Sequence, residues 1–343
     1  MIGDLHFELC DVSAGEAPRG WSDGMHNAGL HDAWSWSVVR ARNQGPGRGR
    51  MLAGMFRDGD RVIGLGAARL HGVGRLAGLV DVDCPGTTSL PGIALPGAVS
   101  TTLHPSGTGP DLLAAALHAF ESALRRECGR WLRAIVYRQL YRAELPVVLR
   151  GATVTREGAP VAVLRNGFAD HDAYLRTLRK SRRVDQRRLA RLVDADPETS
   201  VWLGPARDAD LDVDTMFRLN RATVRRNHRN RWLPMHYWRR EMFAAVLALP
   251  GVDVIRYTDP AGGLIAASLV FDHPVAPVLG PWGARPPGPG RRSGLWFDHL
   301  DRLIRRAVES GRPLVIGGKG QAEMKASLGF VPYQQWSVLR RIG

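Results

Sequence analysis

The alternation of apolar and polar residues predicts a β-hairpin in the first half of the chain. Residues 51–57 and 61–70 are mainly apolar, and an Asp-Gly-Asp turn at 58–60 separates them. Such a pattern is a strong signal for two antiparallel strands joined by a tight turn. Apolar side chains then recur at helical spacing over residues 110–124, and a strand-like run follows at 131–137. We therefore expect a hairpin, an amphipathic helix and a strand in this order.

The second half of the chain repeats this order of elements. We predict a hairpin, a helix capped by Ser293, a strand, a short helix and a last strand, at residues 252–271, 293–310, 314–317, 321–328 and 331–340. Because the first half also ends in a strand-like run, the pattern indicates two α/β units related by duplication. Their predicted extents are residues 1–165 and 166–343, each with a mixed central sheet flanked by helices, and we expect the second unit to carry most of the active site.

The composition is that of an ordinary globular protein. A chain of 343 residues, 44% of them hydrophobic and 23% charged, is long enough for two domains. No run approaches the roughly 18 apolar residues of a membrane span, and the first residues lack the pattern of a secretory signal. Cys10, Cys84 and Cys128 are far apart and lie in no metal-binding spacing. We therefore expect a soluble cytoplasmic protein that spans no membrane and holds no metal.

The net charge of +14 favours a polyanionic partner, because arginines that neutralise phosphates release condensed counterions. All but three of the 47 basic residues are arginine, the exceptions being Lys180, Lys319 and Lys325. In so arginine-rich a chain, a lysine indicates a place that needs a compact ammonium instead of a planar guanidinium. Lys319 and Lys325 lie close together in one glycine-rich segment.

That segment, residues 317–330, carries a family resemblance. A glycine-rich turn is followed by Glu323, by Lys325 two residues later, and then by Gly329-Phe330. In this it resembles the last unit of FemAB-like acyltransferases, which consist of two GNAT-like units and take their acyl group from aminoacyl-tRNA. The resemblance implies that Lys325 and Glu323 are catalytic, with Lys325 donating hydrogen bonds to a developing oxyanion. The alternative is a solvated lysine on a short helix with an ordinary glycine cap.

A basic run over residues 174–193 is predicted to form one helix and contains a single acid, Asp185. FemAB-like proteins have a comparable helix at the start of the second unit, so the resemblance implies phosphate contacts with a tRNA acceptor stem. The cations expected to make them are Arg179, Lys180, Arg182, Arg183, Arg187 and Arg188. The alternative is a solvated helix face with Leu175, Leu178, Leu189 and Leu192 inside.

A second basic cluster follows and is interleaved with aromatic and imidazole rings. Its cations Arg225, Arg226 and Arg229 are expected to contact tRNA, because planar side chains among cations can stack on unpaired bases. In similar enzymes this stretch lies close to the acyl-binding cleft. The side chains expected to line the substrate pocket are His228, Trp232, His236, Tyr237, Trp282 and Lys319.

A competing motif is Arg-x-x-Gly-x-Gly at residues 285–290, which matches the CoA pyrophosphate loop of GNAT acetyltransferases. That loop binds through successive backbone N–H groups, and three of these six residues are prolines, which have none. A CoA-dependent N-acetyltransferase therefore remains the alternative, as does a non-catalytic nucleic-acid-binding module on the same fold.

The expected activity is transfer of an aminoacyl group from aminoacyl-tRNA to an amine, hydroxyl or hydroxylamine. No cofactor is expected, since aminoacyl-tRNA is a co-substrate; acetyl-CoA belongs to the alternative. Fem enzymes that build peptidoglycan insert a long two-helix arm, whereas only one basic helix fits between Asp170 and Asp194. This departure favours a small-molecule acceptor, as in FemAB-like transferases of natural-product pathways.

Overall fold

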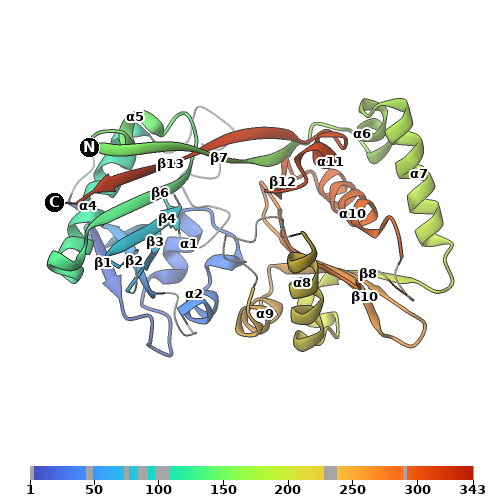
Figure 1. The fold of residues 1–343 in the computed structure, drawn as a ribbon, viewed down its shortest axis with the longest axis horizontal. Helices are drawn as coiled ribbons and strands as arrows, with labels where there is room; N and C mark the ends of the chain where they lie inside the picture. Colours follow the sequence, from blue (N-terminus) through green and yellow to red (C-terminus); the bar gives the residue numbers. More distant parts are fainter. Residues whose placement is uncertain are drawn as a thin grey trace. The chain divides into compact units, whose positions relative to one another are not determined.

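The chain forms two compact units in a computed structural model that describes residues 4–43, 49–72, 77–83, 92–96, 109–227, 238–286, 288 and 292–342. Unit 1 comprises Met1–Pro160 and Tyr333–Gly343, and unit 2 comprises Val161–Pro332 (Figure 1). Each unit has a mixed sheet with helices packed against it. The predicted α/β class is therefore confirmed.

The sheet of unit 1 contains the hairpin predicted from the Asp-Gly turn. In spatial order its strands are β1 (Leu5–Cys10), β2 (Arg50–Asp58), β3 (Arg61–Leu70), β5 (Gly92–Ala94), β4 (Leu79–Asp83), β6 (Ala134–Leu140) and β13 (Val331–Arg341). β2 and β3 are antiparallel, with Asp58 opposite Arg61. β4 pairs in parallel with β6, and β6 pairs antiparallel with β13.

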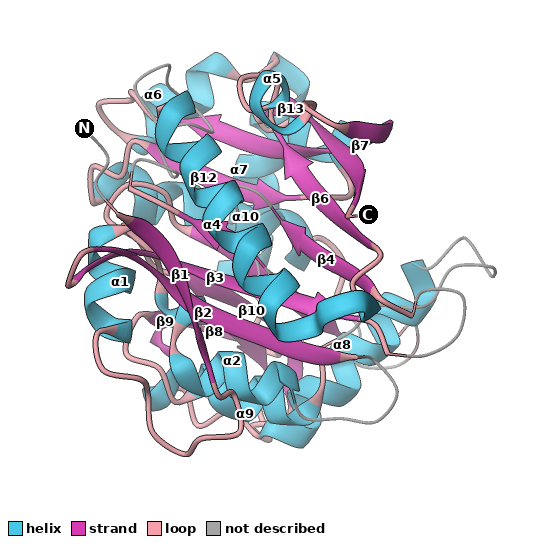
Figure 2. Ribbon diagram, turned by 90° about the vertical axis from the view of Figure 1, so that its left-hand side faces the viewer, coloured by secondary structure: helices cyan, strands magenta, loops and turns pink. Residues whose placement is uncertain are grey.

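The longest helix of unit 1 is the predicted amphipathic one. This helix, α4 (Pro110–Cys128), has Pro110 in its first turn and packs against β1 (Figure 2). Its Phe120 ring lies 5.1 Å from that of Phe7, which lies 4.6 Å from that of Phe56, so three aromatic rings join helix and sheet. The remaining helices are α1 (Trp21–Asn27), η1 (Asp32–Trp34), α2 (Trp36–Asn43), η3 (Gly129–Trp131) and α5 (Leu145–Val148).

The sheet of unit 2 contains the second predicted hairpin. In spatial order its strands are the end of β7 (Ala152–Arg165), then β12 (Leu314–Gly318), β11 (Val278–Ala284), β10 (Leu264–Phe271), β9 (Val252–Thr258) and β8 (Ser200–Pro205). β9 and β10 have the predicted bounds and are antiparallel. β11 pairs in parallel with β12, and the register of β11 against β10 shifts between Ser268 and Val270.

Two long helices of unit 2 hold the strands that carry the site. α10 (Leu295–Glu309) buries Leu300, Leu303 and Ile304 in the core and contacts β12. α8 (Val213–Asn227) lies against β11, and a Cβ atom at Gly283 would be only 2.8 Å from the backbone nitrogen of Asn220. The other helices are α6 (His171–Thr177), α7 (Lys180–Asp194), η4 (Ala206–Asp208), α9 (Arg240–Leu247) and α11 (Ala322–Ala326).

Two local predictions in unit 2 were wrong. The basic run forms two helices instead of one, because Leu178 adopts an extended conformation and is buried between α6 and α7. Arg183 stabilises the break by donating to the carbonyls of Arg176 (3.3 Å) and Leu178 (3.5 Å). Ser293 does not cap α10. The N-cap is Gly294, which has a left-handed conformation (φ 82°) and, as a glycine, no side chain that could form a capping hydrogen bond.

The division between the units differs from the predicted boundary at 165/166. β7 begins in unit 1 and ends in unit 2, where Leu164 lies opposite Val315 of β12. β13, predicted as the last strand of the second unit, pairs with β6 in unit 1. The chain therefore passes from unit 1 to unit 2 within β7 and returns to unit 1 within β13. Within the described residues, no helix combines the length and apolar character that crossing a membrane requires.

Candidate functional site

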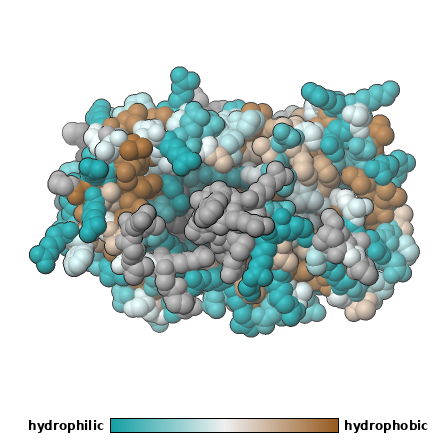
Figure 3. Space-filling model, in the orientation of Figure 1, coloured by the Kyte–Doolittle hydropathy of each residue, from teal (hydrophilic) through white to brown (hydrophobic). Residues whose placement is uncertain are grey.

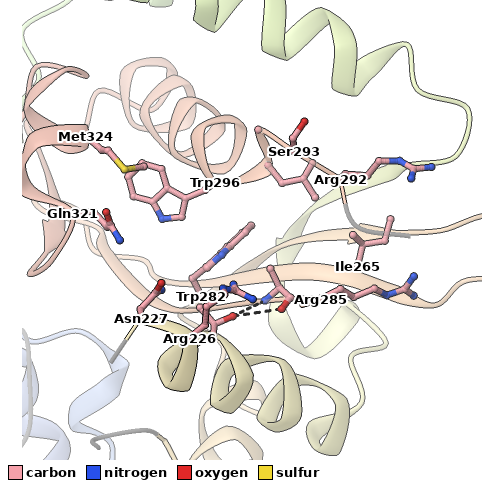
Figure 4. Close-up of a pocket in the computed structure, with 14 residues that line it drawn as sticks. Arg226, Asn227, Ile265, Trp282, Arg285, Arg292, Ser293, Trp296, Gln321 and Met324 are labelled. Carbon is pink, nitrogen blue, oxygen red and sulfur yellow. Dashed lines mark hydrogen bonds between the residues drawn. The ribbon is translucent and has the colours of Figure 1, made fainter. Parts of the chain in front are cut away.

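A pocket of about 410 Å³ lies within unit 2, where five elements meet. Its walls come from the end of α8, from β10 and β11, from the first turn of α10 and from the start of α11 (Figure 4). The side chains that give it its chemical character are those of Thr223, Arg226, Trp282, Trp296, Gln321 and Met324. Such a pocket, with aromatic walls and a few polar groups, suits a small apolar or planar group with polar ends.

The aromatic wall is built around a buried histidine. Trp282 stacks on His299, with ring centroids 4.3 Å apart and planes inclined by 20°, and Trp296 meets the same imidazole edge-on at 5.8 Å. His299 Nδ1 donates to the carbonyl of Leu295 (3.3 Å). Complete burial lowers the pKa of His299 to about 3, so the imidazole is neutral near pH 7. Its Nε2 is then an acceptor, and it has no hydrogen-bond partner among the described residues.

Helix α8 is fastened to β11 at this wall. The side chain of Asn220 donates to the carbonyl of Trp282 (3.0 Å), and the backbone N–H of Ala284 donates to Thr223 Oγ1 (3.1 Å). The last turn of α8, with Arg226 and Asn227, consequently lies at the pocket (Figure 4). Of the predicted site residues, the structure brings Arg226 and Trp282 together in this lining.

Lys325 lies on α11 and is not itself part of the pocket lining. Its side chain is only 3% exposed, and Nζ donates to the carbonyls of Gly318 (3.3 Å) and Lys319 (3.2 Å). Burial lowers the pKa of Lys325 to about 8. Its neighbours Gln321 and Met324 line the pocket, whereas Lys319 and Glu323 are exposed and do not.

The predicted cations on α7 have different environments. Arg182 stacks on Phe297 (4.6 Å from the guanidinium carbon to the ring centroid), and Arg187 pairs with Asp172 at 2.9 Å. Arg188 lies 3.6 Å from Asp185, and both Arg179 and Lys180 are exposed. Arg225, on α8, is exposed as well. The predicted residues His228, Arg229, Trp232, His236 and Tyr237 lie outside the described residues.

The arginine of the CoA-like motif has a structural role in the turn between β9 and β10. Arg285 donates through Nε to the carbonyl of Leu264 (2.9 Å) and through a terminal nitrogen to Asp259 (2.6 Å). That pair lowers the pKa of the Asp259 carboxyl group, which is therefore ionised. The guanidinium is thus already neutralised at the edge of the pocket. Residues 287, 289 and 290 of the motif lie outside the described residues.

Several pocket residues were not identified from the sequence. Trp296 was expected only as part of the apolar stripe of a helix, and Thr223, Gln321 and Met324 gave no signal. These residues line the pocket because of contacts between elements, which the sequence does not show. Gln321 also has a local feature, a left-handed backbone conformation (φ 52°) at the start of α11. Within the described ranges, no group of three or more His, Cys, Asp or Glu residues could hold a metal ion.

Comparisons with known proteins identify the fold. No family model matches the sequence, and no curated protein matches it. FemX superimposes with a TM-score of 0.56 at 9% identity, covering 97% of this chain and 96% of FemX. The C-terminal domain (DUF2156) of a putative lysylphosphatidylglycerol synthetase from Agrobacterium fabrum gives 0.55 at 10% identity, covering 93% and 91% of the two chains. L-PGS from Bacillus licheniformis gives 0.53 at 8% identity, with 80% of each chain covered.

At these identities the similarity is one of fold. The predicted GNAT-like α/β fold is confirmed, because the likeness to FemX extends over nearly the whole of both chains. The chain therefore has the fold that FemX and the DUF2156 domain share.

Proposed function

We propose that this protein is an acyltransferase that moves an aminoacyl group from aminoacyl-tRNA to the amine, hydroxyl or hydroxylamine of a small-molecule acceptor. The observation that carries the proposal is the aromatic pocket of unit 2, together with the buried ammonium of Lys325, which follows the lining residue Met324 on α11. The fold supports it, because FemX and a protein named as a lysylphosphatidylglycerol synthetase have the same architecture.

The pocket would hold the aminoacyl end of the donor between Trp282 and Trp296. The acceptor nucleophile attacks the ester carbonyl carbon, its electron pair forms the new bond, and the carbonyl oxygen becomes an oxyanion. When the oxyanion collapses, the C–O bond to the tRNA breaks, and the ribose oxygen leaves with the proton given up by the acceptor. Holding both reactants in place supplies much of the catalysis in such a reaction.

Lys325 would act as a source of positive potential at the Gln321 end of the pocket. A fixed cation in a site that excludes water stabilises developing negative charge without reorganisation. Two of the three ammonium hydrogens are engaged by carbonyls of the glycine-rich turn. These two hydrogen bonds hold the charge in place. Glu323 is exposed, and we assign it no step.

The exposed cations of unit 2 would bind the tRNA. Arg179 at the N-cap of α7, Lys180 on α7 and Arg225 on α8 have exposed side chains in the same unit as the pocket. Acetyl-CoA is less favoured as the donor, because the arginine of the pyrophosphate-like motif is paired with Asp259. Pro286 also lacks a backbone donor.

The test is filter binding of charged tRNA across a salt series, with acetyl-CoA calorimetry in parallel. The proposal expects steeply salt-dependent binding of tRNA and no signal from acetyl-CoA. Lys325→Met should bind tRNA as the wild type does but transfer the aminoacyl group at least about a hundredfold more slowly. Binding of acetyl-CoA without binding of tRNA would refute the proposal. Binding of tRNA by a wild type that transfers nothing to any nucleophile would indicate a non-catalytic RNA-binding protein.

A further inference from the structure

A second pocket, of about 690 Å³, adjoins the first within unit 2. It lies between α7 and the first turn of α10. The segment 292–295 lines both pockets, one on each side, so that the N-terminal start of α10 is their common wall. A ligand in the second pocket would therefore lie next to a ligand in the first.

The common wall is thin at Gly294. This residue has a left-handed conformation, and a Cβ atom built on it would lie 2.6 Å from Cδ2 of Leu189, a side chain of α7 that lines the second pocket. Because Gly294 has no side chain, Leu189 lies directly against the backbone of the segment that borders both pockets. Gly294 thus permits the close approach of α7 to this wall.

The second pocket has an apolar interior and a rim of arginines. Leu189, Leu192 and Phe297 provide apolar surface. The alternative of a solvated helix face placed Leu192 inside, but this side chain is 54% exposed. A ligand with an apolar group would cover this side chain and remove its surface from water, which is favourable.

The charge at the rim is complementary to an anion. Three guanidinium groups line the pocket, those of Arg182, Arg188 and Arg292, against the two carboxylates of Asp185 and Asp196. Asp196 accepts from Arg292 Nε (2.8 Å), which leaves the terminal nitrogens of that guanidinium, and Asp185 lies at 3.6 Å from Arg188. The remaining positive charge suits a carboxylate or phosphate, which guanidinium groups bind well.

We propose that the second pocket is the acceptor site, and that it takes a small molecule in which an apolar group carries a carboxylate or phosphate. Its role as acceptor site rests on the proposed function, whereas its affinity for such a molecule does not. The nucleophile of the acceptor would reach the aminoacyl group past the backbone of Ser293 and Gly294.

Octyl phosphate, kept below the concentration at which it forms micelles, is the probe. Calorimetry should detect binding of octyl phosphate, with inorganic phosphate and uncharged octyl glucoside each at least about tenfold weaker, because each lacks one of the two features. Leu192→Asp should weaken octyl phosphate binding by about tenfold or more, since it places a negative charge in the pocket.

Val184→Asp is the matched control, because Val184 is also 54% exposed on α7 but lines neither pocket. Its binding of octyl phosphate should stay within about twofold of the wild type. Equal effects of the two substitutions would overturn the proposal. Binding only to phosphatidylcholine vesicles that contain oleate would also overturn it, because the site would then bind a lipid surface. Binding of adenosine monophosphate that Leu192→Asp abolishes would overturn it as well, because the site would then be a nucleotide site. If octyl phosphate binds as expected but charged tRNA does not, the pocket assignment survives and the proposed donor fails.

Discussion

Trp282 of β11 lies flat against His299 of α10, and the two rings are 4.3 Å apart. His299 is completely buried and does not line the pocket, whereas Trp282 does. The imidazole is therefore a support behind the indole and fixes the plane of the pocket wall. Its Nε2 accepts no hydrogen bond from the described residues. The flat shape of the imidazole ring therefore explains the support of Trp282 better than hydrogen bonding at Nε2 does.

Replacing His299 by phenylalanine should preserve the wall. Phenylalanine keeps a flat ring in the same place and removes the buried acceptor Nε2, but it also loses the hydrogen bond from Nδ1 to the Leu295 carbonyl, so the free energy of unfolding should stay within about 1 kcal/mol of the wild type. His299→Ala should lower it by about 3 kcal/mol, because it leaves a cavity behind Trp282. Urea unfolding at pH 7 measures both. A His299→Phe variant as unstable as His299→Ala would show that the imidazole nitrogens are needed.

Acid should separate the wild type from His299→Phe. The pKa of His299 falls from 6.5 to about 3 on folding, so between these values the unfolded chain binds a proton that the folded chain does not. Stability therefore falls as the pH falls below 6.5. Between pH 7 and pH 5 the wild type should lose about 2 kcal/mol more than the variant. Parallel stability curves for the two proteins would contradict this.

The charge of Lys325 should give the reaction an upper pH limit. Burial lowers the pKa of Lys325 from 10.5 to about 8, so the folded protein loses this proton before the unfolded chain does. Transfer should slow as the pH rises through 8, after correction for uncatalysed ester hydrolysis. Over pH 8 to 10 the wild type should gain about 2 kcal/mol of stability in total relative to Lys325→Met. A transfer rate that is flat to pH 10 would exclude a role for the ammonium.

Gly294 and Leu189 should show energetic coupling. Gly294→Ala forces a side chain into a left-handed conformation and against Leu189, at a cost of about 2 kcal/mol. Leu189→Ala removes the atoms with which the new methyl group collides. The double variant should therefore be about 1 kcal/mol more stable than the sum of the single effects. Strict additivity in urea unfolding would indicate that backbone strain alone accounts for the cost.

The salt dependence of tRNA binding should identify contacts on α7. Arg179→Gln and Lys180→Gln should each lower the slope of log K against log salt by about 1, because each removes one phosphate contact. Arg207→Gln is the control, since Arg207 is an exposed arginine of the same unit that lies on η4, outside the basic helices. Equal slopes in all three variants would show that the tRNA does not contact α7.

The elements that sequence patterns predicted were those with a strong local period. β9 and β10 have their predicted bounds, and the helix after residue 293 begins within two residues of its expected start. The break at Leu178 was missed because it depends on burial of that leucine in the core, while arginines on both sides favour a continuous helix. Local propensity does not report such a contact.

The candidate site was predictable only in part for the same reason. Trp282 and Arg226 were identified from aromatic and basic composition, but His299 lies in a helical stripe where it resembles any other polar residue. The stack of His299 on Trp282 joins a helix to a strand and has no signature in either segment. The five elements that line the pocket are likewise brought together by the sheet order of unit 2.

The placement of β13 in unit 1 has a consequence for synthesis on the ribosome. Unit 1 is translated first, yet its sheet lacks the partner of β6 until all of unit 2 has been made. Pairing across so long a stretch of chain is slow, and an unpaired strand edge is prone to aggregate while it waits. Products truncated before β13 would leave the β6 edge open, so the first-made part of unit 1 can complete its sheet only after β13 has been synthesised.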